Sequence, residues 1–209
     1  MGLTVPYEQT GRVNQKARTR EALIAAAREL LSQGINPTME GAAAAASISR
    51  TTAYRYFPSL RALLVATYPH FEERSLLGPD PPEDPAERLE VVAEAITSRI
   101  LAHEAEMRAA LRMSLEGVRP PELPMHQGLR VDWIEDALLP LQGEIAGDQF
   151  RRLTYGVAAT LGIETFTWLT DIAQLSREEA AAVMSSNASR LLSSALADAA
   201  GVPGSRSAQ

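Results

Sequence analysis

The chain has 209 residues, of which 45% are hydrophobic, and it has a formal net charge of −6, three histidines and no cysteine. This length and hydrophobic content suffice for a packed core, and the acidic balance excludes a protein that coats nucleic acid or anionic lipid indiscriminately. The lack of cysteine excludes disulfides, thiolate metal sites and thiol nucleophiles.

The N-terminal residues give no targeting signal. Residues 1–19 lack the apolar core of a signal peptide, and no apolar run approaches the roughly 20 residues that span a bilayer. We therefore expect a cytoplasmic protein with no membrane partner. Residues 1–15 are polar and aperiodic, so we expect them to form a flexible arm.

Two helices are predicted next. Apolar residues recur at helical spacing between Leu23 and Leu31, which predicts a helix with Thr19 as its N-cap and Gly34 as its stop. The alanine-rich segment that follows has high helix propensity, and Thr38 can cap it through its hydroxyl. This second, short helix is expected to end near Ser47.

A third and a fourth helix follow directly. Ser49 can cap the segment RTTAYRYF, which supplies two turns of helix before Pro58 stops it. Ser59 can cap the fourth helix, SLRALLVATYPHFEERSLL, in which Pro69 is expected to produce a kink because proline lacks a backbone N–H.

The rest of the chain reads as helical. The proline-rich segment 78–85 is the clearest boundary, and helices are predicted over 86–116 (one broken helix or two consecutive ones), 125–142, 148–172 and 177–199. No strand-like alternation occurs, so the predicted fold class is all-α. Residues 201–209 are expected to form a disordered tail.

Charge is distributed unevenly along the chain. The segment from Arg12 to Arg61 holds eight basic and three acidic residues, a local charge of +5, which leaves about −11 for the remainder. A small basic region on an acidic body suggests that the basic region contacts a polyanion. A solvated basic face without a partner is the alternative at this point.

The second and third predicted helices form a helix-turn-helix, in which the start of the second helix of the pair enters the major groove of double-stranded DNA. Arg50 suits a bidentate contact with guanine, and threonine side chains suit base edges. Tyrosine hydroxyls suit phosphates, and Tyr54 and Tyr56 point to different sides. The predicted DNA-binding residues are Thr38, Ser49, Arg50, Thr51, Thr52, Tyr54, Arg55, Tyr56 and Arg61.

Residues 19–64 resemble the DNA-binding domain of the tetracycline-repressor (TetR) family of transcriptional regulators. The matching elements, in order, are IAAARELLSQG, PTMEGAAAAA, ASIS, TTAYRYF and SLRALL. The resemblance implies an N-terminal helix-turn-helix domain, here 16–64, and a larger helical domain for ligand binding and dimerisation, here 65–200. It also implies a homodimer that binds a palindromic operator and is released by a small-molecule effector, most often as a repressor.

The sequence departs from the family pattern at the turn and after it. Ser47 stands where the family usually has glycine, so we expect a left-handed turn residue with a modest Cβ penalty. Leu60 stands where a phosphate-contacting lysine is usual, and Arg61 is the nearest substitute. Ala42 and Ala53 replace larger aliphatic residues, which leaves less to bury between the second and third helices.

The last two predicted helices are expected to pair with those of a second subunit. Small residues, among them Gly156, would allow close helix approach, and apolar residues would supply contact area. Burial within one subunit is the alternative use of this surface, whose predicted apolar members are Phe166, Trp168, Leu169, Ala181, Met184, Ala188, Leu191 and Leu192.

Polar and aromatic residues on apolar stripes are the candidates for a ligand pocket, because polar groups there need partners. The predicted ligand-binding residues are His103, Met107, Leu111, His126, Trp133, Glu164 and Trp168. For the histidines, a role as satisfied core or surface residues is the alternative. Glu164 is expected to face a cationic ligand, to pair with an arginine or to lie at the dimer interface.

No motif for catalysis, metal or cofactor binding is present: phosphate-binding loops, nucleophile elbows and paired metal-binding histidines are all absent from the sequence. We therefore expect neither an enzyme nor a cofactor. A helical adaptor that binds a protein and no DNA, or a small-molecule enzyme, are the alternative functions, and neither would bind duplex DNA with salt-sensitive sequence preference.

Overall fold

The structure is a computed structural model that describes residues 7–69, 71, 73–116 and 127–201. Within these ranges the chain forms helices and no β-strand, which confirms the all-α prediction. The predicted tail beyond Gly201 and the first six residues of the predicted arm lie outside the described residues.

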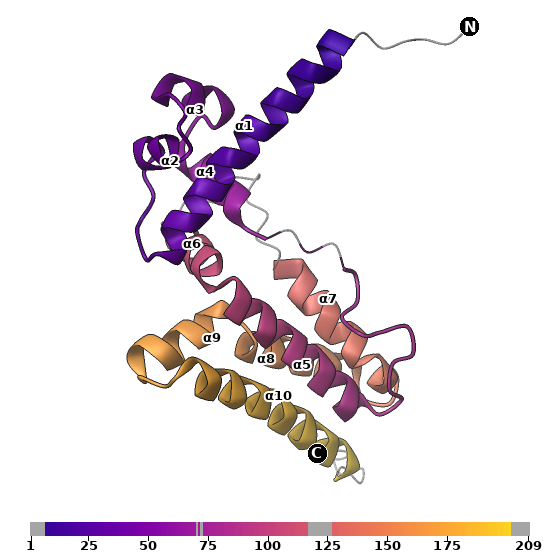
Figure 1. Ribbon diagram of the computed structural model, residues 1–209. Coiled ribbons are helices and arrows are strands. Elements are labelled where there is room, and N and C mark those ends of the chain that lie inside the picture. The colour runs from indigo at the N-terminus through magenta and orange to yellow at the C-terminus, as the bar shows by residue number, and fades with distance from the viewer. Residues whose placement is uncertain (1–6, 70, 72, 117–126, 202–209) are drawn as a thin grey trace, which may run out of the picture. The chain divides into compact units, whose positions relative to one another are not determined.

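The chain divides into two compact units, Met1–His70 with Ala105–Pro124, and Phe71–Glu104 with Met125–Gln209. The helices of the first unit, shown in Figure 1, are α1 (Tyr7–Ser32), α2 (Met39–Ala45), α3 (Arg50–Tyr56), α4 (Leu60–Thr67) and α6 (Glu104–Leu115). The first unit therefore contains α6 in addition to the predicted domain 16–64.

Helix α1 begins at Tyr7, inside the segment that was expected to be a flexible arm. Thr19 lies in the middle of this helix, and its hydroxyl donates a hydrogen bond to the Gln15 carbonyl oxygen one turn earlier (2.9 Å). The prediction of Thr19 as an N-cap is therefore wrong, because its side chain bonds backward along a continuous helix.

Two apolar clusters hold the first unit together. One joins α1, α2, α3 and α4, and it includes Phe57 at the end of α3. Its buried members are Leu23, Ile24, Ala27, Met39, Ala42, Ala43, Ala53, Phe57 and Leu63. The other joins α6 to α1 and α4 through Leu31, Leu64, Ala109, Ala110 and Met113. Burial of these side chains explains why α6 belongs to this unit.

Helix α4 ends at Thr67, and the predicted kink at Pro69 does not occur. Tyr68 adopts extended angles (φ −60°, ψ 134°), because the proline ring that follows disfavours the helical conformation of the preceding residue. None of the described residues between Thr67 and Pro85 belongs to a helix.

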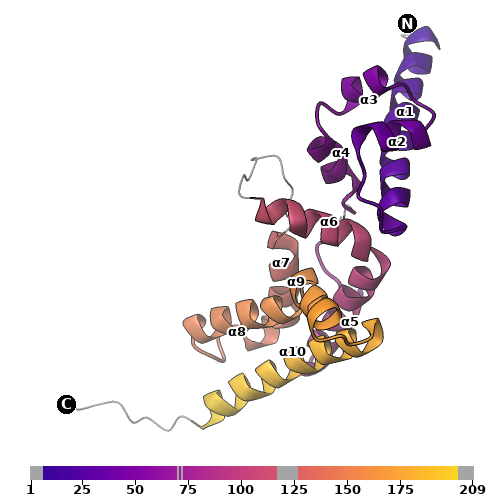
Figure 2. The ribbon, with the colours of Figure 1, turned by 90° about the vertical axis from the view of Figure 1, so that its left-hand side faces the viewer.

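The second unit contains α5 (Pro85–Ala102), α7 (Gln127–Ala137), the 3₁₀ turn η1 (Leu139–Leu141), α8 (Gly147–Thr160), α9 (Ile163–Thr167), the π-helical turn η2 (Trp168–Ile172) and α10 (Arg177–Ala200). Helix α10 packs against α5 and α8 (Figure 2). The helix predicted over 177–199 is confirmed, and the one over 86–116 is divided at His103.

The helix predicted over 148–172 is broken between α8 and α9. Gly162 adopts extended angles (φ −118°, ψ 160°), and a Cβ there would meet the side chains of Arg130 and Glu164. The ion pair between these two residues, 3.1 Å from Arg130 Nη1 to Glu164 Oε2, therefore lies directly over the Gly162 backbone. No helix within the described ranges is long and apolar enough to cross a membrane.

Candidate DNA-binding surface

The turn between α2 and α3 requires a left-handed residue, and Ser47 supplies it with φ +56°. The Ser47 N–H donates to the Ala44 carbonyl oxygen (3.0 Å) and the Ile48 N–H to that of Ala43 (2.8 Å). This is the hydrogen-bond pattern of a Schellman helix end, in which glycine is usual at the left-handed position. The expected turn conformation of Ser47 is confirmed.

Both short helices are capped as predicted. The Thr38 hydroxyl accepts from the Gly41 N–H (2.9 Å) at the start of α2. The Ser49 hydroxyl accepts from the Thr52 N–H (3.2 Å) at the start of α3 and donates to the Thr52 hydroxyl (2.9 Å). These bonds satisfy backbone donors that the first turn leaves without partners, which keeps seven-residue helices intact.

Helix α3 has one buried and one exposed face. Ala53 is fully buried on α1 and α2, and Tyr56 packs beside the same cluster. The side chains that face solvent are those of Arg50, Thr51, Tyr54 and Arg55. The two tyrosines therefore lie on different sides of the helix, as predicted, and the first turn of α3 presents its cation and hydroxyl groups outward.

Arg50 is engaged by two neighbours. Its Nε lies 2.8 Å from Glu40 Oε1, and both side chains are more than half exposed. Its guanidinium carbon lies 5.6 Å from the Tyr54 ring centroid. Because an exposed ion pair contributes only about 0–1 kcal/mol, Arg50 can exchange the Glu40 carboxylate for another acceptor at little cost.

Sequence reasoning did not identify Glu40 as a partner of Arg50. Its acidic charge was counted, but nothing in the spacing of ten residues across a turn predicts an ion pair. Arg20 of α1 was likewise not predicted to have a role. Its guanidinium carbon lies 5.3 Å from the Phe57 ring centroid, so it lies beside the end of α3. The high local basic charge is the only sequence signal that included it.

The remaining predicted contacts are placed as follows. The Arg55 guanidinium carbon lies 5.6 Å from the centroid of the adjacent Tyr56 ring. Arg61 donates from Nη2 to the Met113 carbonyl oxygen (3.2 Å) near the end of α6. Leu60 packs against the apolar cluster of α1, α4 and α6. A phosphate contact by Arg61 stays a prediction, and it would compete with this bond to α6.

The predicted ligand-binding residues do not all belong to the same unit. His103 and Trp133 both contact the Phe71 ring in the second unit, with 5.9 Å between ring centroids in each pair. Met107 and Leu111 belong to α6 of the first unit. His126 lies outside the described residues.

Glu164 and Trp168 occupy different environments. Burial raises the pKa of Glu164, but the charge and hydrogen bond of Arg130 outweigh that effect and hold this pKa below its usual range. Of the three uses expected for Glu164, the structure shows the pairing with an arginine. Trp168 is 57% exposed at the start of the π-helical turn. Among the described residues no group of histidine and acidic side chains could hold a metal ion.

Comparison with known proteins gives a match within the first unit. Residues 23–67 match the family described as bacterial regulatory proteins, tetR family. The matched range runs from the first core residue of α1 to the last residue of α4, and so includes the whole helix-turn-helix. No curated protein matches the chain with significant similarity.

Proposed function

We propose that the chain, whose residues 23–67 match the tetR family of bacterial regulatory proteins, is a DNA-binding homodimeric repressor that a small effector releases from a palindromic operator. The observation that supports it is the outward-facing first turn of α3, held by Ser49 and the Ser47 turn. A helix presented in this way reads base edges in the major groove.

Within this proposal the exposed residues divide by task. Arg50, Thr51 and Thr52 contact base edges, whereas Thr38, Ser49, Tyr54, Arg55, Tyr56 and Arg61 contact the phosphate backbone. The acidic remainder of the chain contributes no phosphate contact. DNA binding also implies that the chain acts in the compartment that holds the chromosome, the cytoplasm.

The dimer surface is proposed on α8 and α10. Tyr155 is 58% exposed and Leu191 37% exposed, and a Cβ at Gly156 would lie 3.8 Å from Leu191 Cδ1. Exposed Ala159 lies one turn beyond Tyr155. These residues form an exposed face of small and apolar side chains where a second copy can approach closely.

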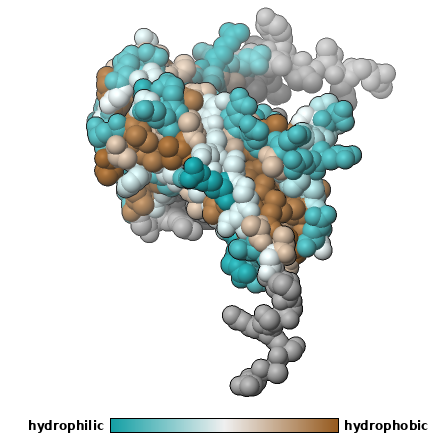
Figure 3. Space-filling view, turned by 90° about the horizontal axis from the view of Figure 1, so that it is seen from below, coloured by the Kyte–Doolittle hydropathy of each residue, from teal (hydrophilic) through white to brown (hydrophobic). Residues whose placement is uncertain are grey.

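Other residues named for dimerisation are used inside the subunit. Phe166, Leu169, Met184, Ala188 and Leu192 are buried within the second unit. The surface seen from below in Figure 3 has separate hydrophobic areas among polar ones. Sedimentation at micromolar concentration tests the dimer: a species of twice the chain mass supports it, and a monomer with and without DNA contradicts it.

Selection of bound sequences from a random duplex pool tests DNA binding and returns the operator. We expect an enriched inverted repeat whose binding weakens steeply with salt. Recovery of no enriched sequence would favour the protein adaptor without DNA binding. An effector site that includes His103 and Trp133 is tested by substituting both residues, which should weaken every effector found.

A further inference from the structure

Aromatic rings and a cation meet between α5 and α7 in the second unit. Arg99 and His103 lie one turn apart at the end of α5, and Trp133 lies on α7. The Phe71 ring contacts both rings edge-on, with interplanar angles of 69° to His103 and 72° to Trp133. The Phe71 ring, which belongs to the segment between α4 and α5, therefore packs against side chains of both α5 and α7.

The charge of Arg99 is satisfied by Phe71 and Glu73 of the connecting segment and by Trp133 of α7. Its guanidinium carbon lies 5.5 Å from the ring centroids of both Phe71 and Trp133, and its Nη2 lies 3.0 Å from Glu73 Oε1. Two aromatic rings and one carboxylate therefore surround the cation.

The buried indole of Trp133 also depends on this segment. Its Nε1 donates to the Glu73 main-chain carbonyl oxygen (2.7 Å), and Trp133 is only 5% exposed. A buried indole N–H requires an acceptor. Phe71 and Glu73 together supply a ring, a carboxylate and an acceptor oxygen to groups that are fixed on α5 and α7.

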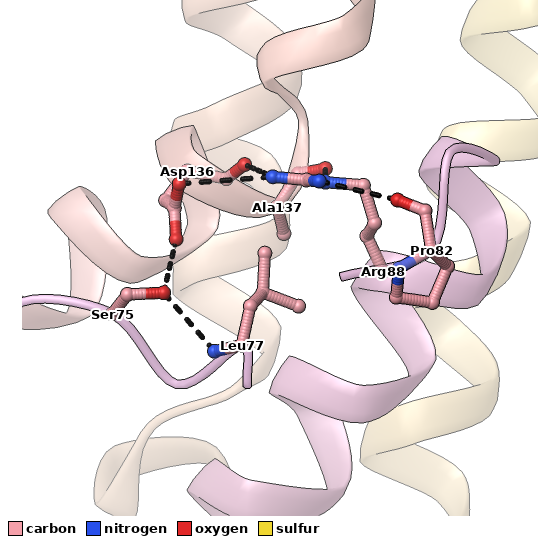
Figure 4. Close-up of polar contacts among 6 residues, drawn as sticks. All are labelled: Ser75, Leu77, Pro82, Arg88, Asp136 and Ala137. Atoms are coloured by element: carbon pink, nitrogen blue, oxygen red, sulfur yellow. Dashed lines mark hydrogen bonds and ion pairs between the residues drawn. The ribbon is translucent and has the colours of Figure 1, made fainter. Parts of the chain in front are cut away.

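The later part of the segment between α4 and α5, from Ser75 to Pro82, has its own contacts with α5 and α7. Arg88 of α5 is buried and donates to the carbonyl oxygens of Pro82 (3.2 Å), Asp136 (2.8 Å) and Ala137 (3.1 Å). Figure 4 shows this arrangement, in which Asp136 also accepts a hydrogen bond from the Ser75 hydroxyl. The chain from Ser75 onward is therefore held without help from Phe71 or Glu73.

We propose that the place occupied by the Phe71 and Glu73 side chains is the effector site of this chain and that its ligand is a small aromatic carboxylate, which displaces both side chains. The ligand's ring takes the place of the Phe71 ring beside His103 and Trp133. Its carboxylate pairs with Arg99 in place of the Glu73 carboxylate, while the indole N–H keeps the Glu73 main-chain acceptor. This inference rests on the proposed function, in which an effector binds among these helices.

The charge of Arg99 decides the ligand class. A cationic ligand would meet the guanidinium at close range and be repelled. A neutral aromatic compound could replace the Phe71 ring but not the Glu73 carboxylate, so it gains less. An aromatic acid replaces both groups at once. Phe71 follows the last residue of α4 by four residues, so its displacement acts on the chain where the DNA-binding helices end.

Calorimetric titration of the full chain with phenylacetate and 3-phenylpropionate, and with the corresponding amides, tests the ligand class. We expect saturable binding of an acid that is about tenfold or more tighter than that of its amide, because a charge-assisted hydrogen bond contributes about 1.5–3 kcal/mol. Equal binding of acid and amide, or no binding of either, would overturn the proposal.

Three variants locate the site. Glu73→Gln removes the competing carboxylate but keeps the main-chain acceptor, so it should tighten acid binding several-fold and leave amide binding unchanged. Phe71→Ala should tighten binding of both. Arg99→Met should abolish the preference for the acid, whereas Arg152→Met, which removes an exposed arginine of the same unit, should bind as the unaltered chain does.

The outcomes separate this inference from the proposed function. Unchanged acid affinity in both Glu73→Gln and Arg99→Met would contradict the site. A chain that selects an operator but binds no aromatic acid contradicts only the ligand inference. A chain that binds the acid through Arg99 but selects no DNA sequence contradicts the regulator function and leaves the site standing.

Discussion

Arg50 on α3 and Arg99 on α5 each lie beside an aromatic ring and a carboxylate, but their surroundings differ. The Arg50 side chain is 68% exposed beside Tyr54 and Glu40, whereas that of Arg99 is 24% exposed between two rings and Glu73. Solvent screens the contacts of Arg50 more strongly than those of Arg99, although Glu40 and Glu73 are about equally exposed. An exposed arginine can change partners easily, whereas an enclosed one requires a replacement for each group it loses.

The largest expected effect comes from substituting Arg88, an arginine that is buried in the second unit. Arg88→Met would remove the donor to one buried and two partly buried carbonyl oxygens, so the free energy of unfolding should fall by about 3–5 kcal/mol. Urea unfolding followed by circular dichroism measures it. The exposed pair Arg152–Asp148 provides the control, since Arg152→Met should change stability by less than about 0.5 kcal/mol.

Arg50→Ala should affect DNA binding and not stability. We expect a loss of about 1–3 kcal/mol on the preferred operator and a relaxed preference at one base pair of each half-site. Titration of single-base operator variants measures both effects. Equal weakening on every variant would mean that Arg50 contacts phosphate, and the assignment of α3 residues to bases would then be shifted.

Arg61→Ala should weaken binding to all duplexes equally and lower the salt slope by about 1 per subunit if its guanidinium reaches a phosphate. The alternative role for Arg61 is structural, because it donates a hydrogen bond to the Met113 carbonyl oxygen. If Arg61 serves only to tie α4 to α6, the unfolding free energy falls while the salt slope stays as it was. Binding at several salt concentrations, with urea unfolding of the same variant, distinguishes the two.

Glu40→Gln should have a smaller effect of opposite sign. It removes a negative charge beside the DNA-binding surface and frees Arg50 from its competing acceptor. We expect tighter binding to every duplex by a few-fold and a smaller difference between operator variants, because Arg50 is then less restrained. Weaker binding to the operator would instead show that Glu40 holds Arg50 in the orientation for reading bases.

The smallest effect concerns the two matched helix ends at Gly34 and Ser47, where both residues have positive φ (73° and 56°). Ser47→Gly should stabilise the chain by about 0.5–1 kcal/mol, because glycine adopts the left-handed region without a Cβ penalty. Gly34→Ser should destabilise it by a similar amount, since a Cβ there meets nothing within 4 Å and only the backbone conformation matters. Thermal unfolding of both variants measures this difference.

The residues by themselves determined the helix-turn-helix and its surface. Thr38, Ser49 and Ser59 cap their helices as predicted, and Ser47 takes the predicted left-handed turn. These features depend on residues three or four positions apart, whose geometry is set by the backbone alone. The division of α3 into a buried and an exposed face follows from the same periodicity.

Only the tertiary structure decided which distant groups meet. Glu164 pairs with Arg130 of α7, Arg61 bonds to α6 rather than standing free on α4, and Phe71, which no periodic pattern marked, contacts His103 and Trp133. Such contacts depend on how helices pack and where a connecting segment crosses them. The spacing of side chains along the sequence does not predict how the helices pack. The pairs of charges and rings can therefore be identified only from the tertiary structure.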